Sequence, residues 1–311
     1  MSAVIPANMA TGRTGTASRE AALREYALAA ALGGPALALL LILFILPVIA
    51  VVVIALTDWQ FGAGTIRFIG LGNFIEMLGD ETIRKSLANT FVYVLIVVPV
   101  TVLSGLAIAL LIESGKGLRA FYRAAHFLPF MATLAAMAIS WEALLHPTVG
   151  LVNQAFVAIG LPPANWLRNS STVLPVLAFI GIWRNLGFAM VIFLAGMKSI
   201  PQDLYDAADI DGADGWLDRL ATVTLPLLGP VTMFVVIITA LRAFETFDTI
   251  KILTQGGPAK ASEMLLYTLY IESFDFMRTG YGAAIAVIFL LIVLVLTLVQ
   301  SRVFDRRVHY S

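Results

Sequence analysis

Two groups of polar side chains interrupt otherwise apolar stretches of this sequence, and their residue types could bind a polyhydroxylated solute. The first group comprises Arg184, Asn185 and Phe188, and the second comprises Arg242, Phe244, Glu245, Thr246 and Asp248. Aromatic rings can cover the apolar faces of a sugar, while amide, carboxylate and guanidinium groups hydrogen-bond to its hydroxyls. These types therefore predict a site for a sugar or a polyol.

The charge of that solute depends on what the two arginines do. Arg242 and Glu245 are spaced i, i+3 on a helix, so one alternative is that they form an ion pair with each other and leave no net charge for the solute. The other is that Arg184 and Arg242 face one cavity and bind an anionic sugar, such as a sulfonated, uronic or phosphorylated one, because the guanidinium fork matches oxyanions. The sequence leaves both alternatives open.

The composition predicts the solvent in which these groups work. Of 311 residues, 59% are apolar and only 13% are Asp, Glu, Lys or Arg, with a mean hydropathy of +0.90. This departs from a soluble globule, which is about a quarter charged, and it indicates a membrane protein rather than a cytosolic enzyme. Twenty basic and twenty acidic residues give a net charge of zero, which does not favour nucleic-acid binding. The absence of cysteine and three scattered histidines predict no metal site.

Charge-free runs predict an all-α integral membrane protein, because an ionised group at the bilayer centre costs at least about 2.5–3.5 kcal/mol. Within a single transmembrane domain over 26–301, six spans are expected at about 32–56, 87–112, 123–145, 173–196, 224–248 and 279–301. The stretch 144–161 is broken by Pro147 and two glycines, so it predicts a short interfacial helix.

Positive charge predicts the orientation of these spans. The segments that include both termini hold 11 Lys and Arg, against 7 in the longer opposite segments, which favours cytoplasmic termini. We expect a disordered N-terminal tail over 1–25 and a short C-terminal tail over 302–311.

The loop over 197–226 has the most structured sequence outside the spans and predicts two short helices joined by a turn. Ser199 and Gln202 fit a capping box, and Gly212 can adopt the left-handed conformation that reverses the chain. From these features alone, an amphipathic loop lying on the membrane surface is an equal alternative to a partner-binding loop.

Part of this loop resembles a known motif. The string from Asp206 to Ala213, followed by Val223-Thr224-Leu225-Pro226, resembles the EAA loop of binding-protein-dependent ABC importer permeases. Asp206 stands where the family usually has Glu, and the loop carries one extra residue. Other stretches are similar to the carbohydrate-uptake branch, the maltose and glycerol-phosphate type permeases: 68–74, 123–129, 194–201 and 254–258.

The resemblance implies a type I importer permease fold and assigns residues to two tasks. The loop would be a coupling helix that docks on an ATPase, with contacts from Leu204, Asp206, Ala207, Ala208, Asp211, Gly212 and Ala213. A sugar held midway in the membrane would be contacted by Arg184, Asn185, Phe188, Arg242, Glu245 and Thr246, together with Phe130 and Thr133 at the third span.

The resemblance also implies the partners. They are a second homologous permease, two ATPase subunits, an extracytoplasmic solute-binding protein and membrane lipid, in the inner membrane of a bacterium or archaeon. The sequence has no P-loop, so ATP and magnesium would bind the separate ATPase, and this chain would have no cofactor and no enzymatic role. Transport would proceed by alternating access.

Two alternatives from other classes use the carboxylates of the same sequence. An intramembrane enzyme or flippase subunit would use Glu142, Glu245 or Asp248 as an acid–base pair and act alone. An ion-coupled secondary transporter would use them for ion coupling and need no ATPase.

Overall fold

The computed structural model describes residues 14–305 apart from 116 and 214. Contacts divide the chain into two units, residues 1–53 and residues 54–311. The first contains α1 (Thr14–Leu40), the π-helical turn η1 (Leu41–Ile45) and most of α2 (Leu46–Ala55). Residues 1–13 and 306–311, which belong to the two expected tails, lie outside the described residues.

The predicted disorder of residues 1–25 is wrong for its last part, because α1 begins at Thr14. Residues 20–25 read Glu-Ala-Ala-Leu-Arg-Glu, which are all good helix formers. They extend the apolar helix that follows them toward the N-terminus.

The second unit is all helical, and no strand occurs among the residues that the structure describes. Its elements are α3 (Gly72–Gly79), α4 (Glu81–Ser114), α5 (Arg119–Met131), α6 (Leu134–Leu144), α7 (Leu151–Ala158), α8 (Val173–Lys198), α9 (Gln202–Ile210), α10 (Trp216–Arg219), η2 (Leu220–Thr224), α11 (Leu225–Leu227), α12 (Gly229–Phe244), α13 (Asp248–Leu253), α14 (Leu265–Tyr270), η3 (Ile271–Asp275) and α15 (Thr279–Asp305). The short helix expected within 144–161 is α7.

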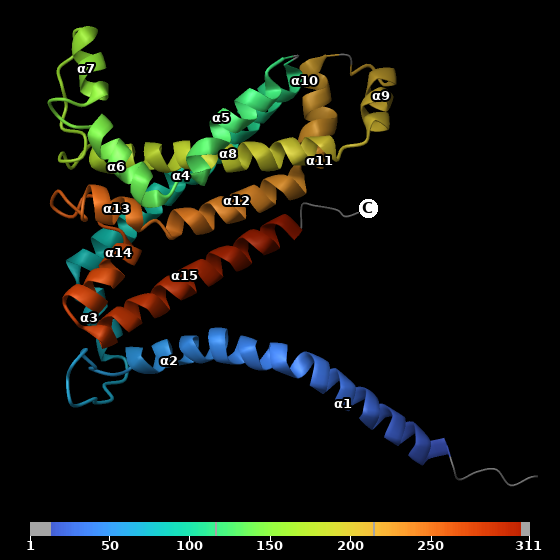
Figure 1. Cartoon of the computed structure of the whole chain (residues 1–311), viewed down its shortest axis with the longest axis vertical. Helices are drawn as coiled ribbons and strands as arrows, with labels where there is room; N and C mark the ends of the chain where they lie inside the picture. Colours follow the sequence, from blue (N-terminus) through green and yellow to red (C-terminus); the bar gives the residue numbers. More distant parts are fainter. Residues whose placement is uncertain (1–13, 116, 214, 306–311) are drawn as a thin grey trace, which may run out of the picture. The chain divides into compact units, whose positions relative to one another are not determined.

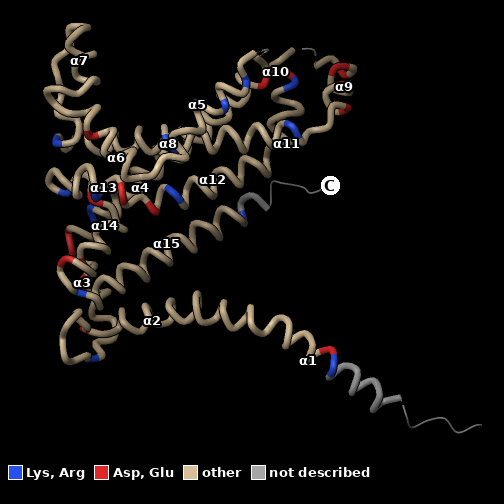
Figure 2. The backbone as a smooth tube through the Cα atoms, viewed as in Figure 1, with Lys and Arg blue, Asp and Glu red and all other residues tan. Residues whose placement is uncertain are grey.

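Five helices are long and apolar enough to cross a membrane: Arg24–Ala55, Glu81–Ser114, Val173–Lys198, Gly229–Leu253 and Thr279–Arg302. Figure 2 shows why: the tube is free of charge along most of α4 and α15, and charged residues gather near helix ends and in loops. The fold is that of an integral membrane protein with up to six spans.

The third expected span, 123–145, is not one straight helix. It consists of α5 and α6, which meet at a bend of 100°. Pro129 cannot donate the backbone hydrogen bond that would continue the ladder, and the Thr133 hydroxyl accepts a hydrogen bond from the Ala136 amide at 3.4 Å to start a new helix. The fifth expected span, 224–248, is made of α11 and α12; α12 ends at Phe244, and α13 follows after a short break.

Helix α8 lies at the centre of the second unit, packed against α4, α5 and α12 (Figure 1). Its crossing with α5 requires a glycine: a Cβ on Gly187 would overlap the backbone carbonyl oxygen of His126. Small residues that let backbones approach are the usual means of packing helices in lipid, where apolar side chains gain little from leaving the solvent.

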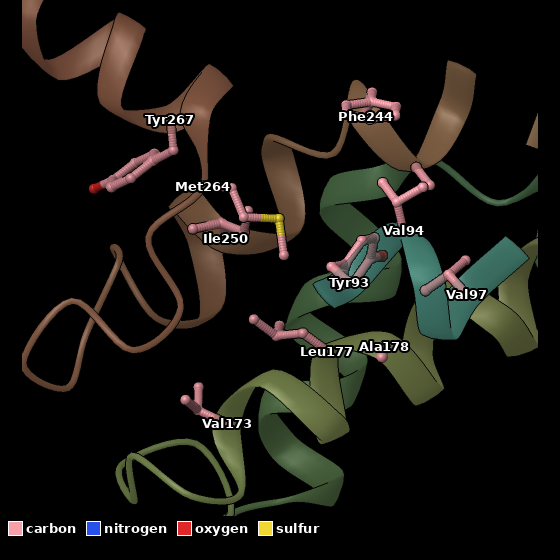
Figure 3. Packing of buried hydrophobic residues seen from close by; sticks show 11 residues of the cluster. Tyr93, Val94, Val97, Val173, Leu177, Ala178, Phe244, Ile250, Met264 and Tyr267 are labelled. Atoms are coloured by element: carbon pink, nitrogen blue, oxygen red, sulfur yellow. The ribbon is translucent and has the colours of Figure 1, made fainter. Parts of the chain in front are cut away.

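A buried apolar cluster connects α8 to the elements beyond α12. It includes Tyr93, Val94, Val97, Val173, Leu177, Ala178, Phe244, Ile250, Met264 and Tyr267, and Figure 3 shows Tyr93 lying among these side chains. This packing fixes α13 against α4 and α8, and so places the polar residues around the α12–α13 break.

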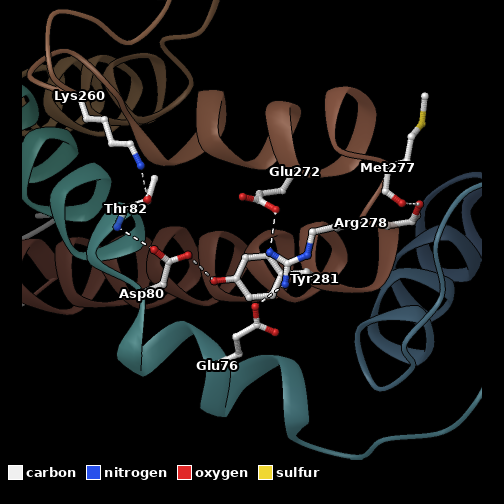
Figure 4. A network of polar contacts seen from close by, with 9 residues as sticks. Glu76, Asp80, Thr82, Lys260, Glu272, Met277, Arg278 and Tyr281 are labelled. Atoms are coloured by element: carbon white, nitrogen blue, oxygen red, sulfur yellow. Dashed lines mark hydrogen bonds and ion pairs between the residues drawn. The ribbon is translucent and has the colours of Figure 1, made fainter.

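A polar network fixes the end of the unit that carries α3. Arg278 pairs with Glu76 of α3 and with Glu272 of η3, the latter at 3.2 Å. The Tyr281 hydroxyl of α15 donates to Asp80 at 2.8 Å, and Asp80 accepts the Thr82 amide at 2.7 Å, which caps α4 (Figure 4). We call this set, Glu76, Asp80, Glu272, Arg278 and Tyr281, the α3–α15 clamp.

Burial and hydrogen bonding act in opposite directions within the clamp. Burial raises the pKa of Glu272, and the nearby Arg278 only partly opposes it. Burial would also raise the pKa of Asp80, but hydrogen bonds from Tyr281 and Thr82 outweigh it and lower that pKa.

Candidate functional site

The two groups singled out in the sequence, apart from Phe188 and Phe244, line one small cavity at the junction of α4, α6, α8 and the α12–α13 break. Its volume is about 50 Å³, and its walls include Tyr93, Leu134, Met137, Gly181, Arg184, Asn185, Arg242, Glu245, Thr246, Phe247, Asp248 and Thr249. We call it the central cavity. It has room for a few waters but is far below the roughly 300–1,000 Å³ of ordinary ligand sites, so this conformation is closed around it.

Two phenylalanines stack beside the central cavity and hold Arg242. The rings of Phe130 of α5 and Phe188 of α8 are stacked with centroids 5.2 Å apart. The Arg242 guanidinium of α12 lies 4.8 Å from the centroid of the first ring and 5.2 Å from that of the second. Three helices far apart in the sequence thus meet in one aromatic and cationic cluster.

The self-neutralising ion pair is not formed. Among the ion pairs of the described residues, none includes Arg242 or Glu245. Glu245 is the C-cap of α12 and is exposed, whereas the Arg242 guanidinium lies over the rings of Phe130 and Phe188.

Arg184 and Asn185 keep hydrogen-bonding capacity at the cavity. The Asn185 amide donates to the Gly181 carbonyl at 2.9 Å, while its Oδ1 and the Nε of Arg184 are buried without a hydrogen-bond partner in the described structure. Buried polar atoms of this kind cost free energy unless a ligand or water satisfies them. The cavity can therefore supply an amide acceptor and guanidinium donors to a polar solute.

Sequence reasoning missed one wall of this cavity. Tyr93 lies in the charge-free run of α4, and its hydroxyl occupies the space where Gly181 has no side chain. The run also contains Ser86, Thr90, Thr101 and Ser104, so a hydroxyl in it did not single out Tyr93. Asp248, expected only as part of the polar group, also lines the cavity, whereas Thr133 lies at the α5–α6 bend and caps α6.

The second predicted site, the loop over 197–226, forms two helices held together by few contacts. Gly212 has a φ of +91° and reverses the chain after α9. Arg219 of α10 pairs with Asp209 of α9 at 2.7 Å, and the hydroxyls of Tyr205 and Thr224 lie 3.1 Å apart. The α9–α10 loop, as we name this segment, is thus a defined element.

The capping box expected at the start of this loop is absent. The Ser199 hydroxyl donates to the Gly196 carbonyl at 2.7 Å and belongs to the end of α8, so Pro201 takes the N-cap position of α9. The Gln202 amide instead donates to Asp206 at 3.2 Å. Because the side chain of Pro201 has no hydrogen-bonding group, this N-cap residue cannot form a capping box.

The exposed surface of α9 carries apolar side chains interspersed with the acidic Asp203 and Asp206. Leu204, Ala207 and Ile210 are exposed at i, i+3, i+6, and Ile210 is 87% exposed. Leu217 is 66% exposed on α10. Ala208 is half-buried, so the predicted pair Ala207 and Ala208 is divided between the two faces. The sequence analysis assigned Leu204 and Ala207 to the coupling surface but did not assign Ile210 or Leu217.

The other predicted coupling residues shape this loop. Asp206 lies on its exposed surface, Asp211 is the C-cap of α9, and the Ala213 amide donates to the Ala208 carbonyl at 2.8 Å. No group of three or more His, Asp or Glu that could hold a metal occurs among the residues that were placed.

Comparisons with known proteins find relatives over most of this chain. A family model described as "binding-protein-dependent transport system inner membrane component" matches residues 69–310. The probable ABC transporter permease protein YurN of Bacillus subtilis is 33% identical over 274 residues, which cover 87% of this chain and 93% of that protein. The sn-glycerol-3-phosphate transport system permease protein UgpA of Agrobacterium fabrum is 34% identical over 253 residues, 79% of this chain and 83% of the relative.

A solved structure shows the same fold. A chain of a bacterial alginate ABC transporter, crystallised in complex with an alginate pentasaccharide-bound periplasmic protein, superposes with a TM-score of 0.80 at 22% identity. The match covers 92% of this chain and 96% of that chain.

Proposed function

The chain belongs to the family of binding-protein-dependent transport system inner membrane components, and we propose that it translocates an anionic sugar or polyol through the central cavity by alternating access. It is an inner-membrane permease subunit of an ABC importer for sugar-type substrates, a transport component rather than an enzyme. The finer statement, that the solute is anionic, rests on Arg242.

One observation carries the anionic assignment: Arg242 lies on the Phe130–Phe188 stack without a carboxylate partner among the described ion pairs. A guanidinium placed on aromatic faces is held in position by cation–π attraction yet keeps its N–H groups for an oxyanion. Arg184, with its unpartnered Nε, lines the same cavity. The relatives support this choice, since one is named for glycerol 3-phosphate transport and the structural neighbour for alginate.

The α9–α10 loop supports coupling to an ATPase. An exposed row of Leu204, Ala207 and Ile210 gives a smooth apolar surface that a partner groove can cover. We assign the ATPase to this end of the bundle and the α3–α15 clamp to the outside. Both termini are proposed to be cytoplasmic because the segments that include them are richer in Lys and Arg. Two ATPase subunits, a second permease and a solute-binding protein complete the proposed complex.

The test is uptake by the reconstituted complex of Arg242→Gln, compared with the wild type, for sn-glycerol 3-phosphate, alginate oligosaccharide and neutral maltose. A hydrogen bond to a charged group contributes about 1.5–3 kcal/mol, so uptake of the anionic solute is expected to fall at least about tenfold. Arg67→Gln, which removes an exposed arginine outside the spans, is the control. Equal loss for neutral and anionic solutes, or no loss, contradicts the anionic assignment.

A further inference from the structure

A second cavity, larger than the central one, lies between the end of α6 and the segment that follows α13. Its volume is about 410 Å³, and its walls include Glu142 of α6, Arg168 of the loop before α8, Leu253 of α13, Thr254 and Gln255. We call it the vestibule. Its volume is within the roughly 300–1,000 Å³ of ordinary small-molecule sites.

The vestibule wall offers every group that a sugar hydroxyl or an oxyanion needs. Glu142 supplies a carboxylate, Arg168 a guanidinium, Thr254 a hydroxyl and Gln255 an amide. Neither Glu142 nor Arg168 takes part in an ion pair among the residues that the structure describes. Their polar groups are therefore directed to solvent or to a ligand and not to each other.

The same two helices line the vestibule and the central cavity. Helix α6 contributes Leu134 and Met137 to the central cavity and Glu142 to the vestibule. Helix α13 contributes Thr249 to the first and Leu253 to the second. Met137 and Glu142 are five residues apart on α6, which is about 7.5 Å along the helix axis, so the two cavities are close neighbours.

The partition between the cavities is a thin apolar wall. Met137 is 4% exposed, and Leu253 packs against the same buried cluster. Met137 faces the central cavity and Leu253 faces the vestibule. Methionine is unbranched and adapts to changes in shape, so this wall can open when α6 and α13 shift by a small amount.

We propose that the vestibule is a first binding site, where a sugar-type solute rests before it passes the Met137–Leu253 wall into the central cavity. This rests on the proposed transport function. The ligand class follows from the lining: a hydroxyl-rich solute binds carboxylate, amide and hydroxyl, and an anionic group on it binds Arg168. A peptide loop of a docked protein is the competing occupant, and the experiment separates the two.

The chain contains no cysteine, so single cysteines report on each position. Gln255→Cys places a thiol on the vestibule wall, and Ala259→Cys places one on the same loop, exposed and outside the vestibule. The complex, purified through a tag on this chain and without binding protein, is labelled by a small hydrophilic maleimide. The probe is sn-glycerol 3-phosphate or alginate pentasaccharide, whichever the wild-type complex takes up.

At a solute concentration of twice the dissociation constant, labelling of Gln255→Cys is expected to slow about threefold by mass action, and labelling of Ala259→Cys to stay constant. Adding Glu142→Gln and Arg168→Gln should remove the protection while Gln255→Cys is still labelled. Uptake by the wild-type complex is measured first, so a failure of the transport function shows as no uptake of either probe.

Three results overturn the inference while leaving the transport function intact. The first is a labelling rate that no solute concentration changes. The second is protection that persists after Glu142→Gln and Arg168→Gln. The third is protection of Gln255→Cys that appears only when substrate-free binding protein is added, which identifies the occupant as a protein loop.

Discussion

At the end of the bundle that carries α3 and α14, one arginine joins carboxylates of two different elements, whereas at the end that carries α9, a single ion pair joins two short helices and leaves Leu204, Ala207 and Ile210 exposed. Arg278 satisfies two carboxylates in the α3–α15 clamp. The α9–α10 loop leaves Ile210 87% exposed and keeps its shape with one ion pair and one pair of hydroxyls. The clamp needs no other chain to hold it, while the loop presents a surface that a partner would bury.

This difference predicts that substitutions at the two ends fail in different ways. A change in the clamp should lower the stability of the subunit and alter uptake only in proportion to the folded protein. A change on the face of the α9–α10 loop should leave stability unchanged and reduce transport. A change in the central cavity is expected to alter which solute is moved.

The largest effect is expected from Ala207→Asp. An unpaired charge buried in an interface costs about 2–5 kcal/mol, so uptake should fall at least about 30-fold. Residue 207 is exposed in this chain, so the melting temperature of the purified subunit and its level in the membrane should not change. The control is Ala63→Asp, the same substitution at an exposed residue of the other end. Normal uptake by Ala207→Asp in a fully assembled complex removes this face from the mechanism.

The clamp is tested by Arg278→Gln. The substitution leaves the buried Glu272 carboxylate without its cation, at a cost of about 1–3 kcal/mol, and should lower the melting temperature by roughly 2–10 °C. Arg67→Gln breaks the exposed pair with Asp58 and should have almost no effect, since exposed ion pairs contribute little. The comparison of the two ends fails if Arg278→Gln abolishes uptake while the melting temperature is unchanged.

A smaller effect is expected from Arg219→Gln inside the α9–α10 loop. It removes the ion pair that joins α10 to Asp209, and because both side chains are partly exposed, uptake should fall only roughly two- to fivefold. Lys85→Gln, which breaks the exposed pair with Glu81 on α4, is the matched control. A melting temperature that falls as far as in Arg278→Gln would show that this loop is a stability element like the clamp.

The smallest effect concerns pH. Burial raises the pKa of Glu272 above its usual 4.5. The protonated carboxyl therefore contributes stability that is full below pH 4.5 and is lost as the pH rises through the raised value. Glu272→Gln should flatten the dependence of melting temperature on pH from about 4.5 upward. An unchanged slope in Glu272→Gln assigns the pH dependence to another group.

Much of the fold could be predicted from the sequence because the membrane imposes one simple rule on it. Charge-free runs located five of the spans, and the spacing of Arg184 and Phe188 identified residues that meet Arg242 in space. The α5–α6 bend was missed because the hydropathy of a segment depends only on its residue types. It does not show that Pro129 interrupts the backbone hydrogen bonds of the helix. The exposed tip of α9 was missed because Ile210 reads as an ordinary apolar residue until the fold shows that nothing in the chain covers it.

The cavities could not be predicted, since they depend on which helices cross closely. The approach of α5 to α8 depends on Gly187, and the position of the Tyr93 hydroxyl depends on Gly181. The sequence places a glycine on a helix but does not show which other helix packs against it. Spacing therefore predicted the residues of the central cavity on each helix but not the wall that α4 and α6 add to it.

The most direct test of the account is uptake into proteoliposomes by a reconstituted complex of this chain with the proposed ATPase, second permease and binding protein. Wild-type uptake of the anionic solute is predicted to require ATP inside and loaded binding protein outside, and to be lost in Ala207→Asp. Uptake that an ion gradient drives without ATP, and that Ala207→Asp leaves intact, would contradict it.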